Sequence, residues 1–520
     1  MTDQSHFVVV GGGTAGWLAA FVLQDAARRQ RLDAKVTVVE SSKIPTIGVG
    51  EGSTAALRVL LRQMGIDEFE FLRDTGATIK YGIRHRDWRR LGHSYDGPID
   101  DPHQVIAAPK GAPSEYLNVF GVAAGRKLAD MHLFGPLMEQ GKAPYARRAD
   151  GSFVPLGPFH HAFHFDQALV GKYLKAKSRG VVIVDATVSG IERQGENGDI
   201  LALMLDGGER LAGDFFIDAT GFRKRIIGQE LGAKWVSYAH ELPVNRAMPF
   251  WLDIKPGEEI APYTLAWAQG AGWLWRIPTQ ERYGCGYVYC DAYCSPDQAK
   301  HEIETVLGHP IEVRNDIKID PGRLDAPWTA NCLALGLASS FLEPLEATSI
   351  HGTIVQLMLF ARDHLKAPAA MTAADRDAYN AKIGRQVDDF RTFINTHYVT
   401  ERDDTPFWRD VRASRLHAET RERLAGWRRA MPRREDFGDF LGGLPHVEAQ
   451  LHYPVLDGLG LLNRDVARAE MARSQSLRDF ARDAVDGLTA EYRTAAGKAM
   501  GHAAFLRAVR DGATLRPTSS

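Results

Sequence analysis

The stretch Gly336–Ile350 combines small residues, a carboxylate at Glu346 and the start of a helix. Small residues at a strand-to-helix junction let a planar ligand or an anion approach the backbone, and the first amides of the helix carry partial positive charge. The same pattern also fits a tight turn with a capping acid and no ligand. The choice between the two depends on the elements elsewhere in the chain.

A second candidate ligand site lies near the amino terminus. The β-branched run Phe7–Val10 is followed by a glycine turn and a helical pattern, and the next strand, Lys35–Val39, ends in Glu40. An acid at this distance accepts the hydroxyls of an unphosphorylated ribose. A glycine turn without a ligand is the alternative. The pattern predicts a dinucleotide site at Gly11, Gly13, Thr14, Ala15, Gly16 and Glu40.

The loop Ile44–Ser53 favours FAD over NAD at this site. It follows the acidic strand end directly and contains several glycines, so it can lie along a long ligand as a strap. There is no second GxGxxG motif for a separate nicotinamide cofactor. We therefore expect Gly48, Val49 and Gly50 to contact FAD.

Lys80 lies in an alternating segment, Ala77–Arg84, that predicts a single strand. Lys80 shares one face with Thr78, Gly82 and Arg84. Taken alone, the pattern predicts a solvent-facing lysine on an amphipathic strand.

The centre of the chain is predicted to be rich in strands and aromatic residues. Three side chains of one strand share a face, and a proline ends the strand. Core packing is the simpler explanation, and the wall of a pocket is the alternative. The residues are Trp273, Trp275, Ile277 and Pro278. The turn at Gln280–Arg282 and the segment Cys285–Tyr289 that follow predict a hairpin.

Three further segments complete the predicted organisation. Residues 91–149 resemble long loops over a sheet. Val181–Val188 is a predicted strand, and the alternation at Ile200–Leu205 and Arg210–Leu211 predicts a β-meander that ends in Gly213–Phe222, a return to the nucleotide sheet. From Thr372 onward the chain is charged and helical, with one helix predicted at Arg464–Ala484. We expect an α/β fold: a GxGxxG FAD-binding domain of the flavin monooxygenase type with a central β-sheet region (1–370), and a mainly helical C-terminal lobe (371–520).

Composition narrows the class of protein. The chain has 63 Lys and Arg against 65 Asp and Glu, a net charge of −2, so no basic field is available for nucleic acid or an anionic membrane. Four cysteines do not form a disulfide framework or a zinc motif, and the 18 histidines show no metal-ligand spacing. No signal peptide or membrane span is evident, so a soluble, cytoplasmic protein without a metal is expected.

Together these motifs resemble the flavin-dependent tryptophan halogenase family. They occur in the order of that family between residue 9 and about residue 460. The tryptophan strand distinguishes this family from ordinary flavin hydroxylases. The matching segments are Gly11–Trp17, Gly48–Glu51, the Lys80 strand with Trp88, Trp273–Pro278, Phe341–Ile350 and Asp404–Trp408.

The resemblance implies halogenation with FADH2, O2 and chloride or bromide, by way of hypohalous acid. Lys80 would meet this oxidant, either by hydrogen bonding or by forming a haloamine, since desolvation makes a neutral amine accessible. Glu346 would orient the oxidant, take the ring proton or stabilise the cationic intermediate. A separate NADH-dependent flavin reductase would supply FADH2.

The resemblance also assigns the remaining site residues. Thr348 and Ser349 match positions that bind the halide ion through the backbone. Trp273, Trp275, Ile277 and Pro278 would wall the flavin off from the substrate, with Tyr453 at the substrate pocket. Additional flavin contacts are expected at Val188, Leu337 and Ile350.

Two departures from the family pattern concern the substrate. The halide stretch reads Glu-Ala-Thr-Ser, where tryptophan enzymes have Glu-Ser-Thr-Gly. The segment Glu448–Pro454 contains one tyrosine, Tyr453, in place of the paired tyrosines and acid that clamp free tryptophan. We therefore expect an indole-like or other electron-rich aromatic substrate. A flavin-dependent aromatic hydroxylase and a non-catalytic flavin-binding relative are the alternatives.

Overall fold

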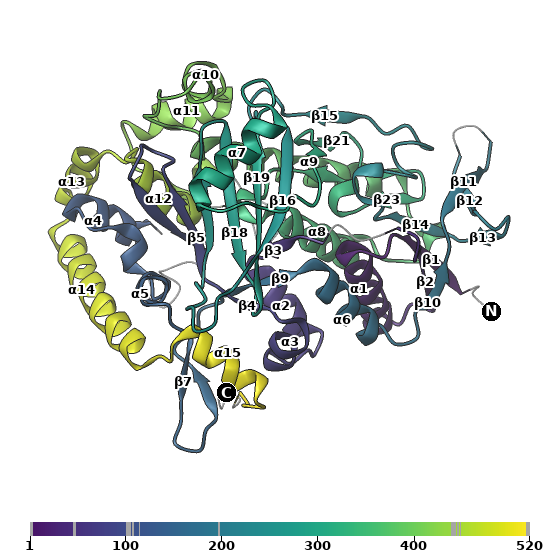
Figure 1. Ribbon diagram of the computed structural model, residues 1–520, viewed down its shortest axis with the longest axis horizontal. Helices are drawn as coiled ribbons and strands as arrows, with labels where there is room; N and C mark the ends of the chain where they lie inside the picture. Colours follow the sequence, from purple (N-terminus) through teal and green to yellow (C-terminus); the bar gives the residue numbers. More distant parts are fainter. Residues whose placement is uncertain are drawn as a thin grey trace.

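The protein has a mixed α/β fold in which a nucleotide-type sheet, a central sheet and a group of helices follow one another across the molecule (Figure 1). One hydrophobic core runs through these parts and includes Trp17, Trp273 and Phe393. A second core lies beneath the carboxy-terminal helices. The computed structural model describes residues 4–44, 48–99, 106, 109–113, 115–195, 198–437, 444, 447 and 449–515.

The nucleotide-type sheet has six strands in the order β10-β2-β1-β14-β23-β22, parallel except for the β22–β23 pair. Helix α1 packs on β1 and β2 and contacts helices α6 and α8. The predicted return of the chain to this sheet is confirmed, since β14 pairs with β1. The elements are β1 Ser5–Val10, α1 Thr14–Gln30, β2 Ala34–Glu40, α6 Gln167–Lys177, β10 Val182–Asp185, β14 Phe215–Asp218, β22 Trp328–Thr329, β23 Cys332–Ala334 and α8 Thr348–Leu359.

The central sheet has seven strands in the order β20-β16-β19-β18-β17-β5-β6. The predicted hairpin of the tryptophan strand is confirmed, because β18 pairs antiparallel with β19. Only β17 and β5 run parallel in this sheet. Its strands are β5 Gly82–Arg86, β6 Ser94–Pro98, β16 Arg246–Asp253, β17 Thr264–Ala268, β18 Gly272–Pro278, β19 Arg282–Tyr289 and β20 Ile317–Lys318.

The segment around Lys80 differs from its prediction. The expected single strand is divided into β4 (Thr78–Lys80) and β5, with Tyr81 between them. Strand β4 belongs to a separate three-stranded sheet in the order β3-β9-β4, with β3 at Gly50–Gly52 and β9 at Ala162–Asp166. Lys80 is buried in this arrangement, so the expectation of a solvent-facing lysine is wrong.

Smaller elements flank the two large sheets. The predicted meander forms a three-stranded antiparallel sheet, and Thr54 and Asp67 cap two short helices by accepting backbone hydrogen bonds. The elements are α2 Ala55–Gln63, α3 Glu68–Thr75, β7 Tyr145–Arg147, β8 Phe153–Pro155, β11 Val188–Arg193, β12 Ile200–Leu205, β13 Arg210–Ala212, β15 Trp235–Ser237, α7 Pro296–Leu307, β21 Gly322–Leu324 and β24 Ser340–Phe341.

The prediction of long loops over residues 91–149 is wrong for much of its length. Helices α4 (Tyr116–Ala124) and α5 (Phe134–Gln140) form there, in addition to strands β6 and β7. Helix α4 packs against α13 and α14, far along the chain, so its burial depends on contacts that local composition does not reveal. Residues 100–105, 107, 108 and 114 of this segment lie outside the described residues.

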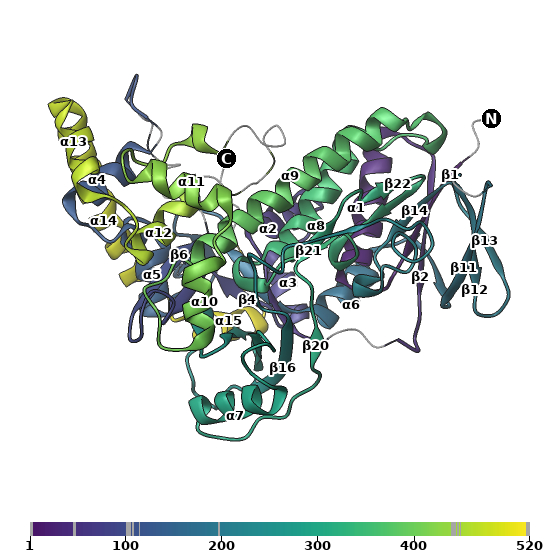
Figure 2. The same ribbon diagram turned by 90° about the horizontal axis from the view of Figure 1, so that it is seen from above.

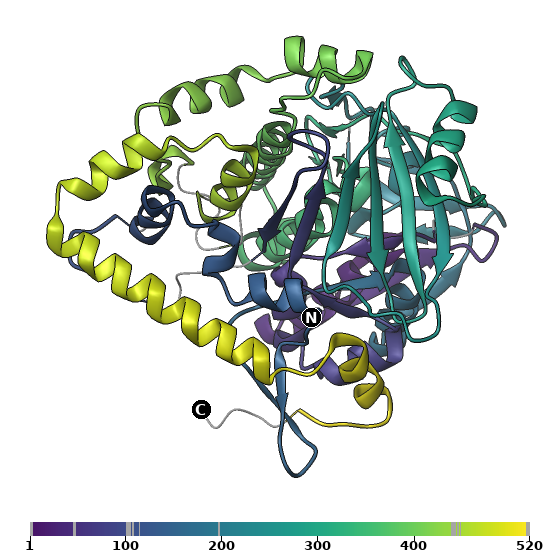
Figure 3. The same ribbon diagram turned by 60° about the vertical axis from the view of Figure 1, so that its left-hand side comes forward.

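The carboxy-terminal part is helical, as predicted. Apart from isolated bridges at Gly501 and Leu515, every regular element described after Phe341 is a helix (Figures 2 and 3). The predicted helix Arg464–Ala484 is interrupted near Ser474, which caps α14. No described helix is long and apolar enough to cross a membrane. The helices are α9 Ala373–His397, α10 Pro406–Ser414, α11 Ala418–Trp427, α12 Ala449–Leu459, α13 Arg464–Ala472, α14 Gln475–Lys498 and α15 His502–Arg510.

Gly50 of the predicted strap, Ile44–Ser53, packs closely against Gly284 of the central sheet. A Cβ on Gly284 of β19 would lie 2.5 Å from the Cα of Gly50 in β3. We expect Gly284→Ala to lower the free energy of unfolding by about 1–3 kcal/mol, because the strands have no room to accommodate a methyl group. Denaturant unfolding measures this. Gly426→Ala on exposed helix α11, with no atom within 4 Å of the new Cβ, is the control, and equal effects of the two changes would contradict the expectation.

Candidate active site

The strand-to-helix stretch Gly336–Ile350, called the late junction below, folds back onto the amino-terminal glycine turn. Strand β23 pairs with β14, and a short 3-10 helix, Gly336–Ala338, follows. Gly336 has φ +61°, and a Cβ there would lie 2.9 Å from the Cβ of Ala15. The structure therefore brings together two segments more than 300 residues apart in sequence that the sequence analysis singled out.

A cavity of about 230 Å³ lies beside the glycine turn. Gly11 has φ +122°, no atom lies within 4 Å of a Cβ on Gly13, and no side chain caps the first amides of α1. Glu40 accepts a hydrogen bond from Trp17 Nε1 (3.1 Å) and pairs with Lys175. An acid and helix amides at an open glycine turn fit the ribose and phosphates of a dinucleotide. The cavity is lined by Gly12, Gly13, Trp17, Glu40, Gln167, Ala168, Gly171, Lys172 and Lys175.

The described part of the strap lies between the 230 Å³ cavity and Lys80. Gly48 is exposed, the Val49 carbonyl accepts the amide of Gln167 (3.4 Å), and Gly50 packs on the central sheet. The next residue, Glu51, accepts a hydrogen bond from Gln167 Nε2 (2.6 Å), and burial raises the pKa of Glu51 to about 7. Residues 45–47 of the predicted loop lie outside the described residues.

Three predicted flavin contacts lie on different elements. Val188 is buried in β11, within a small core that includes Val10 of β1. Leu337 lies in the 3-10 helix that abuts the glycine turn, and Ile350 is buried in the first turn of α8. The latter two therefore flank the junction where the two motifs meet.

Lys80 is enclosed by the strap. Only 1% of its surface is exposed, and Nζ donates a hydrogen bond to the Ser53 carbonyl (3.0 Å). Burial lowers the pKa of Lys80 to about 8, although the charges of Glu346 and Glu51 oppose the shift. At pH 7 most Lys80 side chains therefore carry a proton, and roughly one in ten is the neutral amine.

Glu346 is held by two histidines that the sequence analysis did not identify. Its Oε1 lies 2.9 Å from His397 Nε2 and 3.4 Å from His85 Nε2. Burial alone would raise the pKa of Glu346, but the contacts with His397 and His85 outweigh it and hold the pKa at about 2. One carboxylate oxygen of Glu346 and one ring nitrogen of each histidine lie within 4.8 Å of one another. Histidine and glutamate are also residue types that bind transition metals.

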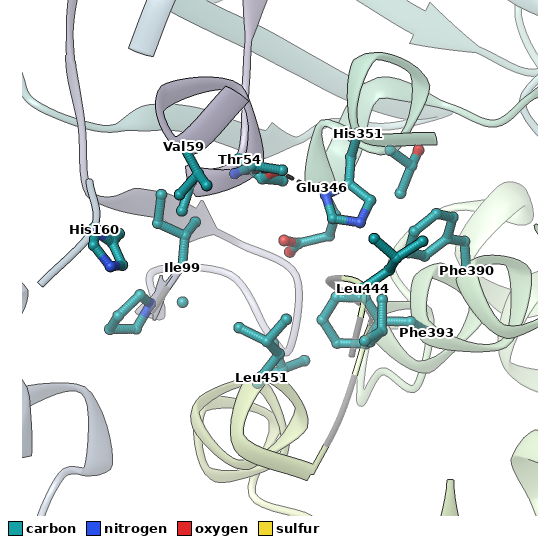
Figure 4. A pocket seen from close by; sticks show the side chains of 17 residues that line it. Thr54, Val59, Ile99, His160, Glu346, His351, Phe390, Phe393, Leu444 and Leu451 are labelled. Atoms are coloured by element: carbon teal, nitrogen blue, oxygen red, sulfur yellow. Dashed lines mark hydrogen bonds between the residues drawn. The ribbon is translucent and has the colours of Figure 1, made fainter. Parts of the chain in front are cut away.

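The Glu346 carboxylate points into a cavity of about 420 Å³ (Figure 4). This volume is within the range of small-molecule sites. Glu346 is the one carboxylate among the lining residues, and no lysine or arginine is among them. Thr54 Oγ1 and His351 Nδ1 form a 2.7 Å hydrogen bond at one wall. The lining residues are Thr54, Ala55, Ala56, Val59, Gly97, Pro98, Ile99, His160, Glu346, Thr348, His351, Phe390, Phe393, Leu444, Val447, Leu451 and Val455.

Helix α8 begins at Thr348, two residues after Glu346. Ala347 has a left-handed backbone conformation (φ +56°), and no side chain caps the helix. The buried Thr348 hydroxyl has no hydrogen-bond partner in the described part of the chain, while the Ser349 carbonyl accepts a hydrogen bond from Thr353. The first amides of α8 therefore have the character of an anion site.

The tryptophan strand packs behind the acid and not on the cavity. Trp273 Nε1 donates to Glu343 Oε2 (2.6 Å), which also accepts from the Tyr398 hydroxyl (2.7 Å). Trp275 lies against Gly286, Ile277 approaches Gly50, and the Pro278 carbonyl accepts from Thr78. None of these four predicted wall residues lines the 420 Å³ cavity. Burial raises the pKa of Glu343 to about 7.

Tyr453 also lies away from this cavity. It is buried in α12, and its hydroxyl donates to the Pro432 carbonyl (2.9 Å). Leu451 and Val455 of the same segment line the cavity instead. Glu448, at the start of the predicted lid segment, lies outside the described residues.

Sequence reasoning missed His85, His397 and Glu343. His85 lies one residue beyond the alternating segment Ala77–Arg84 that was predicted as one strand, and His397 ends a charged helix. Their partners are distant in sequence, so spacing gave no signal. Glu343 lies three residues before Glu346 in the stretch already singled out, and that proximity was the one available sign.

Comparison with known proteins identifies the family. Residues 6–451 match the family model described as tryptophan halogenase. The tryptophan 6-halogenase SttH of Streptomyces toxytricini is 32% identical, over 93% of this chain and 96% of its own length. The 7-chloro-L-tryptophan 6-halogenase KtzR of Kutzneria sp. (strain 744) is also 32% identical, over 93% of this chain and 98% of its own.

A solved structure agrees with this match. Tar14, a tryptophan C-6 flavin-dependent halogenase from taromycin biosynthesis, superposes with a TM-score of 0.86 at 28% identity, covering 98% of this chain and 100% of its own. These relatives support halogenation over hydroxylation. The chain therefore belongs to the tryptophan halogenase family of flavin-dependent halogenases.

Proposed function

We propose that this halogenase uses FADH2, O2 and chloride or bromide to halogenate an uncharged, indole-like aromatic in the 420 Å³ cavity. One observation carries the proposal: the Glu346 carboxylate enters an apolar cavity, its charge acts on the buried Lys80, and no lysine or arginine is among the described residues that line the cavity.

The amino-terminal cleft fits FAD. Glu40 suits the ribose, and the amides that start α1 suit the pyrophosphate. Reduced flavin, when bound, supplies two of the four electrons that bring O2 to the oxidation level of water, and the halide supplies the other two as it becomes hypohalous acid. The residues that would hold it are Gly11, Gly13, Thr14, Ala15, Gly16, Glu40, Gly48, Val49, Gly50, Val188, Leu337 and Ile350.

The amides of Thr348 and Ser349 would bind the halide. They begin a helix without a side-chain cap, where partial positive charge favours an anion. Thr348 also lines the cavity, so this end of α8 borders the space proposed for the substrate.

Lys80 and Glu346 would carry out the transfer to the ring. Lys80 either donates a hydrogen bond to hypohalous acid or forms a haloamine with it; in both cases the halogen moves to a ring carbon and the broken bond leaves its electron pair on oxygen or nitrogen. The ring C–H bond then breaks, its electrons restore aromaticity, and Glu346 accepts the proton. The low pKa of Glu346 keeps it anionic beforehand.

The tryptophan strand would separate the flavin from the substrate cavity. Trp273, Trp275, Ile277 and Pro278 lie behind the junction that contains Glu346, and the hydrogen bond from Trp273 to Glu343 fixes the two segments together. Such a wall favours a diffusing oxidant over direct oxygen transfer. The absence of a second nucleotide motif supports a separate NADH-dependent flavin reductase.

We expect Lys80→Ala to lower the yield of halogenated product by at least about 100-fold, since a positioned acid–base group contributes about 10²–10⁴-fold. Hypohalous acid should still form and be captured by an added scavenger. The control Lys382→Ala, at an exposed position of α9, should leave the yield unchanged. Product is measured by mass and isotope pattern. Full yield from the Lys80 variant would refute the proposed role.

We expect kcat/KM for indole to exceed that for tryptophan by at least about tenfold, because the tryptophan carboxylate would lose hydration in the same cavity as the Glu346 carboxylate, and no lysine or arginine is among the described lining residues to pair with it. Tryptamine and indole-3-propionate separate the two charges, and 3-methylindole controls for size. A clear preference for tryptophan would contradict the proposed substrate class.

A further inference from the structure

The contacts of His397 determine how many protons the Glu346 site holds. His397 Nδ1 lies 3.0 Å from the Phe393 carbonyl, and His397 Nε2 lies 2.9 Å from Glu346 Oε1. A carbonyl oxygen only accepts, so Nδ1 must carry a hydrogen. A neutral ring would then present a lone pair from Nε2 to the carboxylate, which is repulsive at this distance.

The contact is therefore satisfied only by one additional proton. An imidazolium at His397 beside a carboxylate agrees with the low pKa of Glu346, whereas a protonated Glu346 that donates to Nε2 does not. In both arrangements the pair holds one more proton than a neutral imidazole and a carboxylate would. His85 supplies a second contact to the same oxygen, and its ring stacks on Tyr95 at 4.5 Å with an interplanar angle of 10°.

These contacts leave one Glu346 oxygen for the cavity. Both histidines approach Oε1, and no hydrogen bond to Oε2 is found among the described residues. Two other glutamates, Glu51 and Glu343, have no histidine within hydrogen-bonding distance among the described residues, and burial raises the pKa of each to about 7. The histidine hydrogen bonds thus distinguish Glu346 from these two, although the charge of His397 also acts on Glu343.

We propose that His397, assisted by His85, is a positioning residue that keeps a shared proton on Oε1 of Glu346 and thereby leaves Oε2 as the base facing the substrate. This inference rests on the proposed function of Glu346. The other titratable groups that act on the cluster are Lys80 on β4, Tyr95 and Asp96 on β6, and Glu343 beside Tyr398.

The test compares turnover of His397→Phe with that of the unchanged enzyme between pH 6 and 8. Without the imidazolium, the pKa of Glu346 should approach that of the other two glutamates. The ratio of variant to unchanged turnover should then fall about tenfold between pH 8 and pH 6, since one pKa unit is a tenfold change in the proton equilibrium. The charge of Glu346 raises the pKa of Lys80, so protonation of Glu346 in the variant would also lower the pKa of Lys80, and both changes contribute to the pH dependence of the ratio.

Two further variants separate this role from a structural one. His397→Gln keeps a donor near Oε1 without a titrating ring and should show an intermediate pH dependence. His452→Phe, which contacts Phe393 but not Glu346, should leave the ratio constant with pH, and thermal unfolding checks that all variants fold. A His397→Phe ratio that is the same at every pH would overturn the proposal.

A readout without turnover distinguishes this proposal from the proposed function. In protein labelled with ¹⁵N-histidine, the unchanged chain should show a histidine protonated on both nitrogens at pH 8, absent from His397→Gln. If this signal is present but no halogenated product forms, the proposed function fails and the proton assignment stands. Absence of the signal, or a stoichiometric transition metal lost in His397→Gln, overturns the assignment.

Discussion

The arrangement of this molecule depends on keeping two opposite charges away from water. Lys80 and Glu346 are both withdrawn from solvent, and an unpaired buried charge is costly. The fold compensates each of them differently. Lys80 donates to a carbonyl of the strap, while Glu346 has two imidazole rings. The strap, the central sheet and helix α9 must therefore all be in place before Lys80 and Glu346 have the burial and hydrogen bonds described above.

This requirement explains why the segments are interleaved in sequence. The glycine turn, the strap, the tryptophan strand and the late junction come from different parts of the chain, yet they share one hydrophobic core. A small displacement of β3 would move both the cofactor strap and the carbonyl that holds Lys80. The division of the chain at residue 370 remains a prediction, as does the cytoplasmic location.

The parts predicted well from sequence were those with local signals. The glycine turn and its flanking strands, and the hairpin of the tryptophan strand, follow from patterns within a few residues. The environment of Lys80 could not be predicted in this way, because the strap that encloses it comes about 30 residues earlier and β9, which pairs with β4, comes about 80 residues later. His397 reaches Glu346 only because a long helix ends beside the junction, and helical periodicity does not indicate where a helix end will lie.

The backbone at Ala347 has a consequence for how this site can vary. A left-handed conformation costs a residue with a side chain about 1–2 kcal/mol relative to glycine. Glu346 and Thr348, on either side, have different surroundings because the chain turns sharply there. Substitutions that preserve this bend can reshape the cavity from α9 and α12 while the acid and the helix start keep their relative orientation. Diversity among related enzymes would then be concentrated on those two helices, with the bend itself held constant.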